Sequence, residues 1–224
     1  MQIKAEKLEK QFLRKSGSGN IFTAVAETDF VLEEGKLTVL MGRSGSGKST
    51  LLSMLAGLLE PTAGKVIAGD LDLYKADDNK RSAFRAENFG IIPQGQTGIL
   101  SLSVRENILL PYTLFGENPP EDNRCDELIS KLSIEDITDV KPGELSGGQI
   151  RRMAIARALV KRPRVIFADE PTGDLDDKTT DDVLNLLKDE ARAGAAVLLV
   201  THESAAEKFA DVLCKMSEGV LTKQ

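Results

Sequence analysis

The segment that most constrains this chain is the glycine-rich stretch 42–49, which reads GRSGSGKS. An apolar run at 37–41 precedes it, and an apolar stretch with helical spacing at 51–60 follows it. This order fits the phosphate-binding pattern G-x-x-x-x-G-K-[ST], in which glycines let backbone N–H groups surround a phosphate. The following helix adds the positive end of its dipole. The sequence therefore predicts a strand, a phosphate-binding loop and a helix within an α/β fold.

Two side chains of this loop have expected roles. Lys48 is expected to reach the β- and γ-phosphates of a nucleotide, and Ser49 to ligate Mg²⁺. The alternative is a chance glycine-rich turn, which the flanking strand and helix disfavour. The residues expected to contact the nucleotide here are Gly42, Arg43, Ser44, Gly45, Ser46, Gly47, Lys48, Ser49 and Thr50.

Composition excludes several classes of protein. The chain has 224 residues, of which 41% are hydrophobic and 29% charged, as in a globular domain with a sizeable core. The formal net charge of -6 argues against nucleic acid as a partner. Cys125 and Cys214 are too few for a disulfide framework, which favours the cytosol. No apolar stretch approaches the ~18 residues of a spanning helix, so we expect another chain to hold this one at any membrane.

The remaining pattern predicts strands alternating with helices around a helical insertion. Several prolines and amphipathic patches at 104–110 and 121–132 indicate a helical subdomain over about 95–145. The stretches 1–94 and 146–224 are expected to form the core with a β region, so that 1–224 is one domain. The expected strands are 21–25, 30–32, 37–41, 165–168 and 196–201, the expected core helices are 51–60, 148–161 and 178–192, and 16–20 is expected to be a flexible hairpin loop. Such alternation predicts a parallel sheet covered on both faces.

Two adjacent carboxylates follow the apolar run 165–168. Asp169 is expected to hold Mg²⁺, and Glu170, pointing the other way, to accept a proton from an attacking water. Acids at such a place often cap a helix instead, but the phosphate-binding loop favours the catalytic interpretation. His202, the one histidine of the chain, follows the apolar run 196–201, where by itself it would be taken as structural.

A second loop with anion-binding character, LSGGQ at 145–149, precedes a helical stretch rich in arginine. The simplest interpretation is a serine that caps a helix opened by glycines. A hydroxyl, two glycines and a helix N-terminus also make a second anion site, and one Mg-nucleotide does not need both loops from one subunit. The basic run 151–164 and the acidic run 169–190 are open to two interpretations, solvated faces or an interface.

Four motifs together carry a family resemblance. GRSGSGKST, LSGGQ, VIFADEPTGDLD and VTHE, in this order and at these intervals, resemble the ATP-binding subunit of an ABC transporter. The resemblance covers essentially the whole chain. It implies an α/β P-loop NTPase (RecA-like) core with a mainly parallel sheet, an N-terminal antiparallel β region and an inserted helical subdomain. It also implies a homodimer with two ATP molecules, each held between the phosphate loop of one copy and the LSGGQ signature of the other.

The resemblance also assigns roles to residues. It makes Gln94 the glutamine that touches Mg²⁺ and transmits to the membrane subunit, His202 a contact of the γ-phosphate, and Asp176 the aspartate that communicates between sites. The signature residues facing the partner's nucleotide are Ser146, Gly147, Gly148 and Gln149. The expected catalytic residues are Glu170, His202, Lys48 and Gln94, the expected metal ligands are Ser49, Gln94 and Asp169, and the expected cofactors are ATP and Mg²⁺.

Some positions leave alternatives or depart from the family pattern. The aromatic ring that stacks on adenine falls at Phe12, where Tyr is usual, and Phe22 is a competing candidate. Pro93 stands before Gln94 where an aromatic residue is common, and Ile150 follows the signature where a polar residue is usual. The departure at Pro93 bears on the coupling between the nucleotide and the membrane subunit that the resemblance assigns to the Gln94 loop.

The stretch 102–111 and the run EPTGDLD resemble one branch of the family. That branch includes macrolide exporters, lipoprotein-releasing ATPases, bacitracin-type efflux pumps and the cell-division ATPase that partners an FtsX-like protein. We therefore expect a subunit that drives a separate integral membrane permease, FtsX-like or similar, from the cytoplasmic face of the membrane, in drug or peptide efflux or lipoprotein release. The alternative is a regulatory module that acts on an FtsX-like partner without transporting a substrate.

Overall fold

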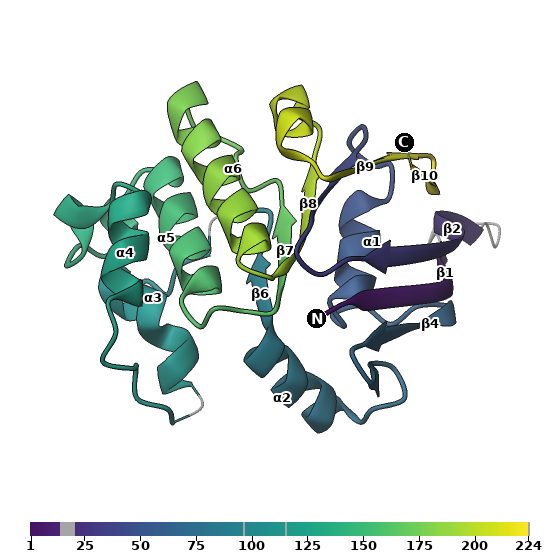
Figure 1. The fold of residues 1–224 in the computed structure, drawn as a ribbon, viewed down its shortest axis with the longest axis horizontal. Helices are drawn as coiled ribbons and strands as arrows, with labels where there is room; N and C mark the ends of the chain where they lie inside the picture. The colour runs from purple at the N-terminus through teal and green to yellow at the C-terminus, as the bar shows by residue number, and fades with distance from the viewer. Residues whose placement is uncertain (14–20, 96, 115, 224) are drawn as a thin grey trace.

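A computed structural model of the chain describes residues 1–13, 21–95, 97–114 and 116–223, so the loop expected at 16–20 lies outside the described residues. The described strands form two sheets (Figure 1). The larger sheet has the order β10-β9-β3-β8-β7-β6, and only β10 runs antiparallel to its neighbour. Its strands are β3 (Leu37–Met41), β6 (Phe89–Ile92), β7 (Val165–Asp169), β8 (Ala196–Thr201), β9 (Val212–Ser217) and β10 (Val220–Lys223).

The central strands of this sheet are buried along their whole length. Every residue of β3, β7 and β8 is buried, which explains why these runs are almost continuously apolar. Met41 pairs with Thr201, and Asp169 pairs with Val200. The parallel register therefore brings the carboxyl ends of the three strands to one edge of the sheet, and with them the segments that follow.

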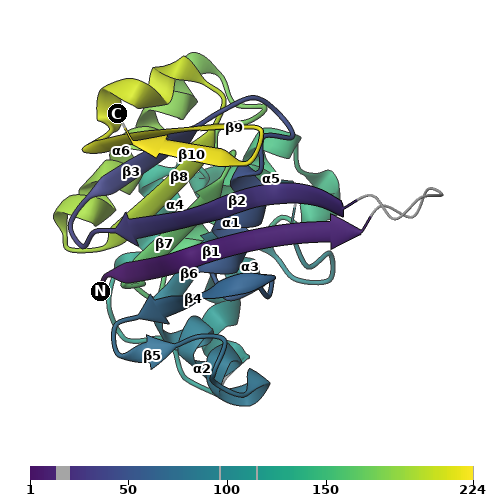
Figure 2. The same ribbon diagram turned by 90° about the vertical axis from the view of Figure 1, so that its right-hand side faces the viewer.

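The smaller sheet is antiparallel and has the order β2-β1-β4-β5. It contains β1 (Ile3–Leu13), β2 (Ile21–Leu32), β4 (Ala63–Ala68) and β5 (Leu71–Asp72), and Figure 2 shows the length of the β1-β2 pair. The expectation of two strands at 21–25 and 30–32 was wrong, because β2 continues through the polar residues between them. Pairing with β1, with register shifts, holds this stretch extended despite its polarity.

The helices are α1 (Lys48–Leu55), α2 (Asp78–Asn88), α3 (Val104–Thr113), α4 (Arg124–Lys131), α5 (Gly147–Leu159) and α6 (Asp177–Arg192), with 3-10 turns at Glu135–Ile137, Pro142–Glu144 and Ser204–Phe209. The helix expected over 51–60 ends early, at Leu55, because Gly57 takes a left-handed conformation with φ of 67°. The helices expected at 148–161 and 178–192 are present with small shifts at their ends. Within the described part of the chain, no helix combines the length and apolar character that crossing a membrane requires.

Two hydrophobic clusters cover the two faces of the larger sheet. On one face, residues such as Val39, Ile166 and Leu199 pack against α3, α4, α5 and α6. On the other, Leu40 and Phe167 pack against α1 and the antiparallel sheet. Figure 1 shows this arrangement, with α3 to α6 on one side and β1, β2 and β4 on the other. The sheet is thus covered on both faces, as its apolar strands require.

Asn107 organises the connection that leads into α3. Its side chain is fully buried, accepts a hydrogen bond from the Ile99 backbone N–H at 2.8 Å, and lies within hydrogen-bond distance of the carbonyls of Ile99, Leu102 and Ser103. One amide therefore binds four backbone groups of this connection, two of which, the carbonyls of Ile99 and Ser103, also accept backbone N–H groups.

Replacing this amide tests its contribution. We expect Asn107→Ala to lower the free energy of unfolding by about 1–3 kcal/mol, because the Ile99 N–H and the Leu102 carbonyl lose their hydrogen bonds to the Asn107 side chain. Urea denaturation measures the change. Asn123→Ala is the control, since Asn123 is exposed and makes no capping bond with its side chain. Equal stability of the two variants would contradict the role of Asn107.

Candidate active site

The phosphate-binding loop connects β3 to α1 and packs closely against neighbouring backbone. A Cβ atom at Gly42 would lie 2.4 Å from the carbonyl oxygen of Met216, and one at Gly47 would lie 2.2 Å from that of Ala24. Gly47 also has a φ of 106°, which side chains rarely allow. Glycine is therefore required at both positions, and the pattern identified in the sequence has a steric cause.

Lys48 lies inside this loop. Its side chain is buried, and its ammonium donates hydrogen bonds to the carbonyls of Gly42 at 2.8 Å and Arg43 at 3.0 Å. Carbonyl oxygens thus hold the charge at the centre of the loop, beside the N-terminus of α1. A phosphate in the loop would add a stronger, charged acceptor for the same donor.

A pocket of about 400 Å³ gathers most of the residues expected to bind and hydrolyse the nucleotide. It is lined by Phe12, Phe22, Ala24, Ser44, Gly45, Gly47, Lys48, Ser49, Thr50, Gln94, Glu170 and His202. The remaining loop residues, Gly42, Arg43 and Ser46, line a neighbouring hollow of about 830 Å³ that also includes His202. Segments far apart in the sequence therefore meet at one edge of the sheet.

Both aromatic candidates face this pocket. Phe12 pairs directly with Phe22 across β1 and β2, and both rings are partly exposed. The Lys10 ammonium lies 5.1 Å from the centre of the Phe12 ring. The structure thus does not separate the two candidates but places both rings where a base held by the loop could stack.

Asp169 ends β7 and has the environment of a metal ligand. It is only 7% exposed, and one of its carboxylate oxygens, Oδ1, is buried with no hydrogen-bond partner. Burial raises the pKa of Asp169, while the nearby Ser49 hydroxyl opposes this shift. An orphaned oxygen beside a hydroxyl fits Mg²⁺, which usually takes one or two protein oxygens together with water and substrate phosphates. The described residues contain no cluster of three or more His, Cys, Asp or Glu, so a phosphate would have to complete such a site.

Glu170 is held at both carboxylate oxygens. Its Oε1 lies 2.9 Å from Nδ1 of His202, and its Oε2 accepts a hydrogen bond from the Thr201 hydroxyl at 3.1 Å. Glu170 itself has a φ of 48°, and its backbone N–H bonds the Val200 carbonyl at 2.8 Å. The left-handed backbone at Glu170 thus turns the chain after β7, and Glu170 lines the same pocket as Lys48.

Thr201 is a site residue that sequence reasoning missed. It is 1% exposed, and besides its bond to Glu170 its hydroxyl accepts the Glu203 backbone N–H at 3.1 Å. A hydroxyl at the end of a buried strand, directly before the histidine, was the available signal.

The signature loop lies at a different pocket. A hollow of about 550 Å³ is lined by Ser146, Gly147, Gly148, Arg152, Asp174, Leu175, Asp176 and Thr179, and it shares no residue with the pocket of the phosphate loop. Ser146 caps α5 in a reciprocal arrangement, since Gln149 N–H bonds the Ser146 hydroxyl and Ser146 N–H bonds the Gln149 side chain. The plain capping interpretation of this serine is therefore correct, and it leaves the glycines facing the hollow.

Asp176 caps α6 in a similar way. Its carboxylate accepts hydrogen bonds from the Thr179 backbone N–H at 2.9 Å and the Thr179 hydroxyl at 2.8 Å. These bonds lower the pKa of Asp176, the backbone bond from Thr179 most. The structure thus divides most of the expected residues between two regions of the chain rather than gathering them in one pocket, and Asp169 and Gln149 line neither of the two pockets.

A titration of His202 tests the geometry at Glu170. The hydrogen bond to Glu170 raises the pKa of His202, so the contact favours the protonated ring and its stabilising effect is lost as pH rises through the raised value. In Glu170→Gln we expect the pKa of His202 to fall toward that of a free imidazole. Proton NMR measures it directly, because the chain has one histidine. Glu207→Gln serves as the control, because Glu207 is another carboxylate that lines a hollow with His202. Equal titration curves of His202 in the wild type, Glu170→Gln and Glu207→Gln would contradict the contact.

Comparisons with known proteins agree with this arrangement. The family described as ABC transporter matches residues 25–173. The chain is 31% identical over 224 residues to the lipoprotein-releasing system ATP-binding protein LolD of Idiomarina loihiensis, covering 99% of this chain and 97% of that protein. It is 34% identical over 212 residues to the macrolide export ATP-binding/permease protein MacB of Marinobacter nauticus, covering 94% of this chain but 33% of that longer protein.

A solved structure extends the similarity to the fold. The ATP-binding cassette MJ0796, in a dimeric post-hydrolysis state bound to ADP and Pi, has a TM-score of 0.89 and 30% sequence identity, covering 99% of this chain and 98% of that chain. The match includes the P-loop NTPase core with its mixed sheets. On these grounds, the chain belongs to the ABC transporter family and is an ATP-binding subunit that hydrolyses ATP.

Proposed function

We propose that two copies of this chain enclose two ATP molecules, each between the phosphate loop of one copy and the signature loop of the other. The observation that carries this proposal is the division of the expected nucleotide contacts between two separate pockets. Neither pocket alone contains the phosphate loop together with Ser146 and Gly148. A second copy would complete each site, in keeping with the dimeric state of MJ0796.

Each residue of the phosphate-loop pocket has a distinct role in this proposal. Lys48 and the loop amides bind the β- and γ-phosphates, and Glu170 takes the proton of the attacking water. Thr201 orients the Glu170 carboxylate, and His202, which contacts Glu170 in this structure, would turn to the γ-phosphate when nucleotide is bound. Ser49, Asp169 and Gln94 would hold Mg²⁺, which supplies charge neutralisation at the phosphates when bound. Phe12 and Phe22 offer the stacking surface for the base.

Removing the proton acceptor tests this chemistry. We expect Glu170→Gln to reduce kcat for ATP hydrolysis by about 10²- to 10⁴-fold, because a general base is lost, while ATP still binds. A phosphate-release assay and titration with a fluorescent ATP analogue measure the two quantities. Glu135→Gln makes the same change at an exposed position, and it should behave as the wild type. An unchanged kcat in Glu170→Gln would refute the role of Glu170.

The partner of this subunit is proposed to be a separate membrane permease, with the chain on the cytoplasmic face of the membrane. LolD and MacB are named for lipoprotein release and macrolide export, whereas MetN of Cereibacter sphaeroides, 40% identical over 203 residues, is named for methionine import. The proposal of efflux or release therefore rests on the resemblance of 102–111 and EPTGDLD to the exporting branch. We assign 95–145 as the helical subdomain and the rest of 1–224 as the core of one ATPase domain. Helices α3 and α4 lie within that subdomain.

A groove beside the helical subdomain has the properties of a docking site for the permease. It has a volume of about 240 Å³ and is lined by residues of α2, β6, α3 and α5, among them Phe89, Leu110, Pro111 and Arg157. Leu114, at its rim, is 66% exposed. Apolar side chains that remain exposed in a groove favour contact with another protein.

A charge placed in this groove tests the docking site. We expect Leu114→Asp to reduce the amount of membrane permease that co-purifies with the chain from its host membrane, because an apolar contact becomes a buried carboxylate. Leu58→Asp is the control, since Leu58 is also exposed but lies outside the groove. Quantitative mass spectrometry measures the ratio. Recovery of no membrane protein with the wild-type chain would contradict the transporter proposal itself.

A further inference from the structure

The segment that carries Gln94 is attached to the helix that carries the signature loop. It leaves β6 at Pro93 and enters the connection to α3 at Thr97 and Gly98. The signature loop forms the N-terminus of α5, which begins at Gly147. Gln94 and the signature loop serve different half-sites, so contacts between their supporting segments would connect the two.

Arg151, in the second turn of α5, holds the beginning of this segment. Its guanidinium donates a hydrogen bond to the Pro93 carbonyl at 3.1 Å, and the residue is 5% exposed. A Cβ atom at Gly173 would lie 3.8 Å from Nη2 of the same guanidinium, so Arg151 also adjoins the chain that connects Glu170 to Asp176. A buried guanidinium thus lies among three segments of the catalytic site. Pro93, which departs from the family pattern, supplies the carbonyl that it binds.

Arg157, near the end of α5, holds the other end of the segment. Nη2 of Arg157 donates to the Thr97 carbonyl at 2.7 Å and to the Thr97 hydroxyl at 2.8 Å. Desolvation lowers the pKa of Arg157, consistent with a guanidinium that is removed from water. Arg157 also lines the groove proposed to receive the permease.

A third contact involves no charge. A Cβ atom at Gly98 would lie 2.9 Å from Cε of Met153 on α5 and 3.0 Å from Pro142, so Gly98 lies in close contact with α5 and with the turn that precedes it. Packing at Gly98 and hydrogen bonds at Pro93 and Thr97 thus connect described residues on both sides of Gln94 to α5. Close-packed interiors transmit such displacements rather than absorbing them.

We propose that Arg151 and Arg157 are positioning residues that fasten the Gln94 segment to α5, so that a displacement of Gln94 at one nucleotide moves the signature loop at the other. The inference rests on the proposed composite sites. In this arrangement the two arginines touch neither nucleotide. They act through Gln94 on one side and through the Ser146 loop on the other.

A mutational cycle on ATP-driven dimerisation tests this proposal. The full chain carries Glu170→Gln throughout, and light scattering gives the dimer Kd in saturating MgATP. We expect Arg151→Met with Arg157→Met to weaken the dimer by about 5- to 150-fold, the usual range of coupling between sites. The affinity of the monomer for a fluorescent ATP analogue should stay within about twofold of that of the parent chain, because a change in the coupling between sites need not alter the phosphate loop itself. Arg157→Lys should retain most of the effect of the native residue, because an ammonium can still donate to Thr97.

Combination with Gln94→Ala distinguishes positioning from general destabilisation. If the arginines act through Gln94, replacing them in a chain that already carries Gln94→Ala should not raise the dimer Kd any further. If the arginines and Gln94 act independently, the two factors by which they raise the dimer Kd should multiply. Thr97→Val, which removes one acceptor and keeps the shape, should weaken the dimer less than Arg157→Met. Arg192→Met is the control, because Arg192 forms an exposed ion pair with Asp189 on α6.

Three results would overturn the inference: an unchanged dimer Kd, effects that multiply with Gln94→Ala, or an equal loss of ATP binding by the monomer. Failure of the parent chain to dimerise with ATP would instead reject the proposed composite sites. The two failures are therefore separable.

Discussion

The parallel pairing of β3, β8 and β7 is the constraint on which the rest of the structure depends. Backbone hydrogen bonds along these strands align their carboxyl ends, so the phosphate loop, the carboxylates at the end of β7 and the histidine after β8 meet at one edge. Burial of all three strands fixes the register, since a slip by one residue would reverse the faces that α1 and α5 cover. The geometry of Glu170 and His202 follows from this alignment.

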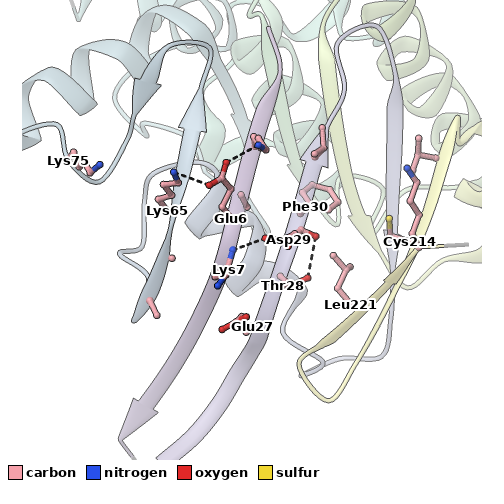
Figure 3. A pocket seen from close by; sticks show the side chains of 17 residues that line it. Glu6, Lys7, Glu27, Thr28, Asp29, Phe30, Lys65, Lys75, Cys214 and Leu221 are labelled. Atoms are coloured by element: carbon pink, nitrogen blue, oxygen red, sulfur yellow. Dashed lines mark hydrogen bonds and ion pairs between the residues drawn. The ribbon is translucent and has the colours of Figure 1, made fainter.

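A hollow larger than either of the two at the phosphate loop lies elsewhere, between the antiparallel sheet and the β9-β10 pair, and has a different character. It has a volume of about 1120 Å³, and Figure 3 shows Glu6 of β1 paired with Lys65 of the neighbouring strand β4. Hydrogen bonds from Lys4 and Lys65 lower the pKa of Glu6 to about 2. Glu6 is therefore already paired with Lys4 and Lys65. By contrast, Asp169 at the sheet edge keeps an unpaired oxygen, which is a feature of a site that awaits a ligand.

The basic run 151–164 is used mainly within the protein. Arg152 donates to the carbonyls of Leu132 and Ser133, as Arg151 and Arg157 do to those of the Gln94 segment. Guanidinium groups suit this task because each offers several donors in a fixed plane. Lys161 and Arg162 pair with acids that precede α4. Most of these charges therefore have partners within the chain, and Arg152, Arg157 and Lys161 also line the two hollows proposed as interfaces.

A buried ion pair joins the helical subdomain to the core. Arg124, at the start of α4, contacts Glu190 of α6 at 2.6 Å and the Leu159 carbonyl at 3.3 Å. Both side chains are largely buried, so loss of either would leave an uncompensated charge. Together with the arginines of α5, this pair indicates that the subdomain is attached to the core at several charged points rather than through apolar packing alone.

The sequence by itself determined the elements whose signals are local. The phosphate loop, β7, β8, α5 and α6 could be predicted, because a buried parallel strand is apolar throughout and a helix has a cap and a period that few residues specify. The carboxylates and the histidine could be located for the same reason, since each directly follows such a strand. Only the tertiary structure decided the rest. The charged strand β1 and strand β9 are extended because they pair with β4 and β3, which are remote in sequence, and the polar middle of β2 is extended because it pairs with β1. Thr201, Arg151 and Arg157 were missed because a hydroxyl or guanidinium has no role until the fold brings an acceptor to it, and those acceptors are Glu170, Pro93 and Thr97.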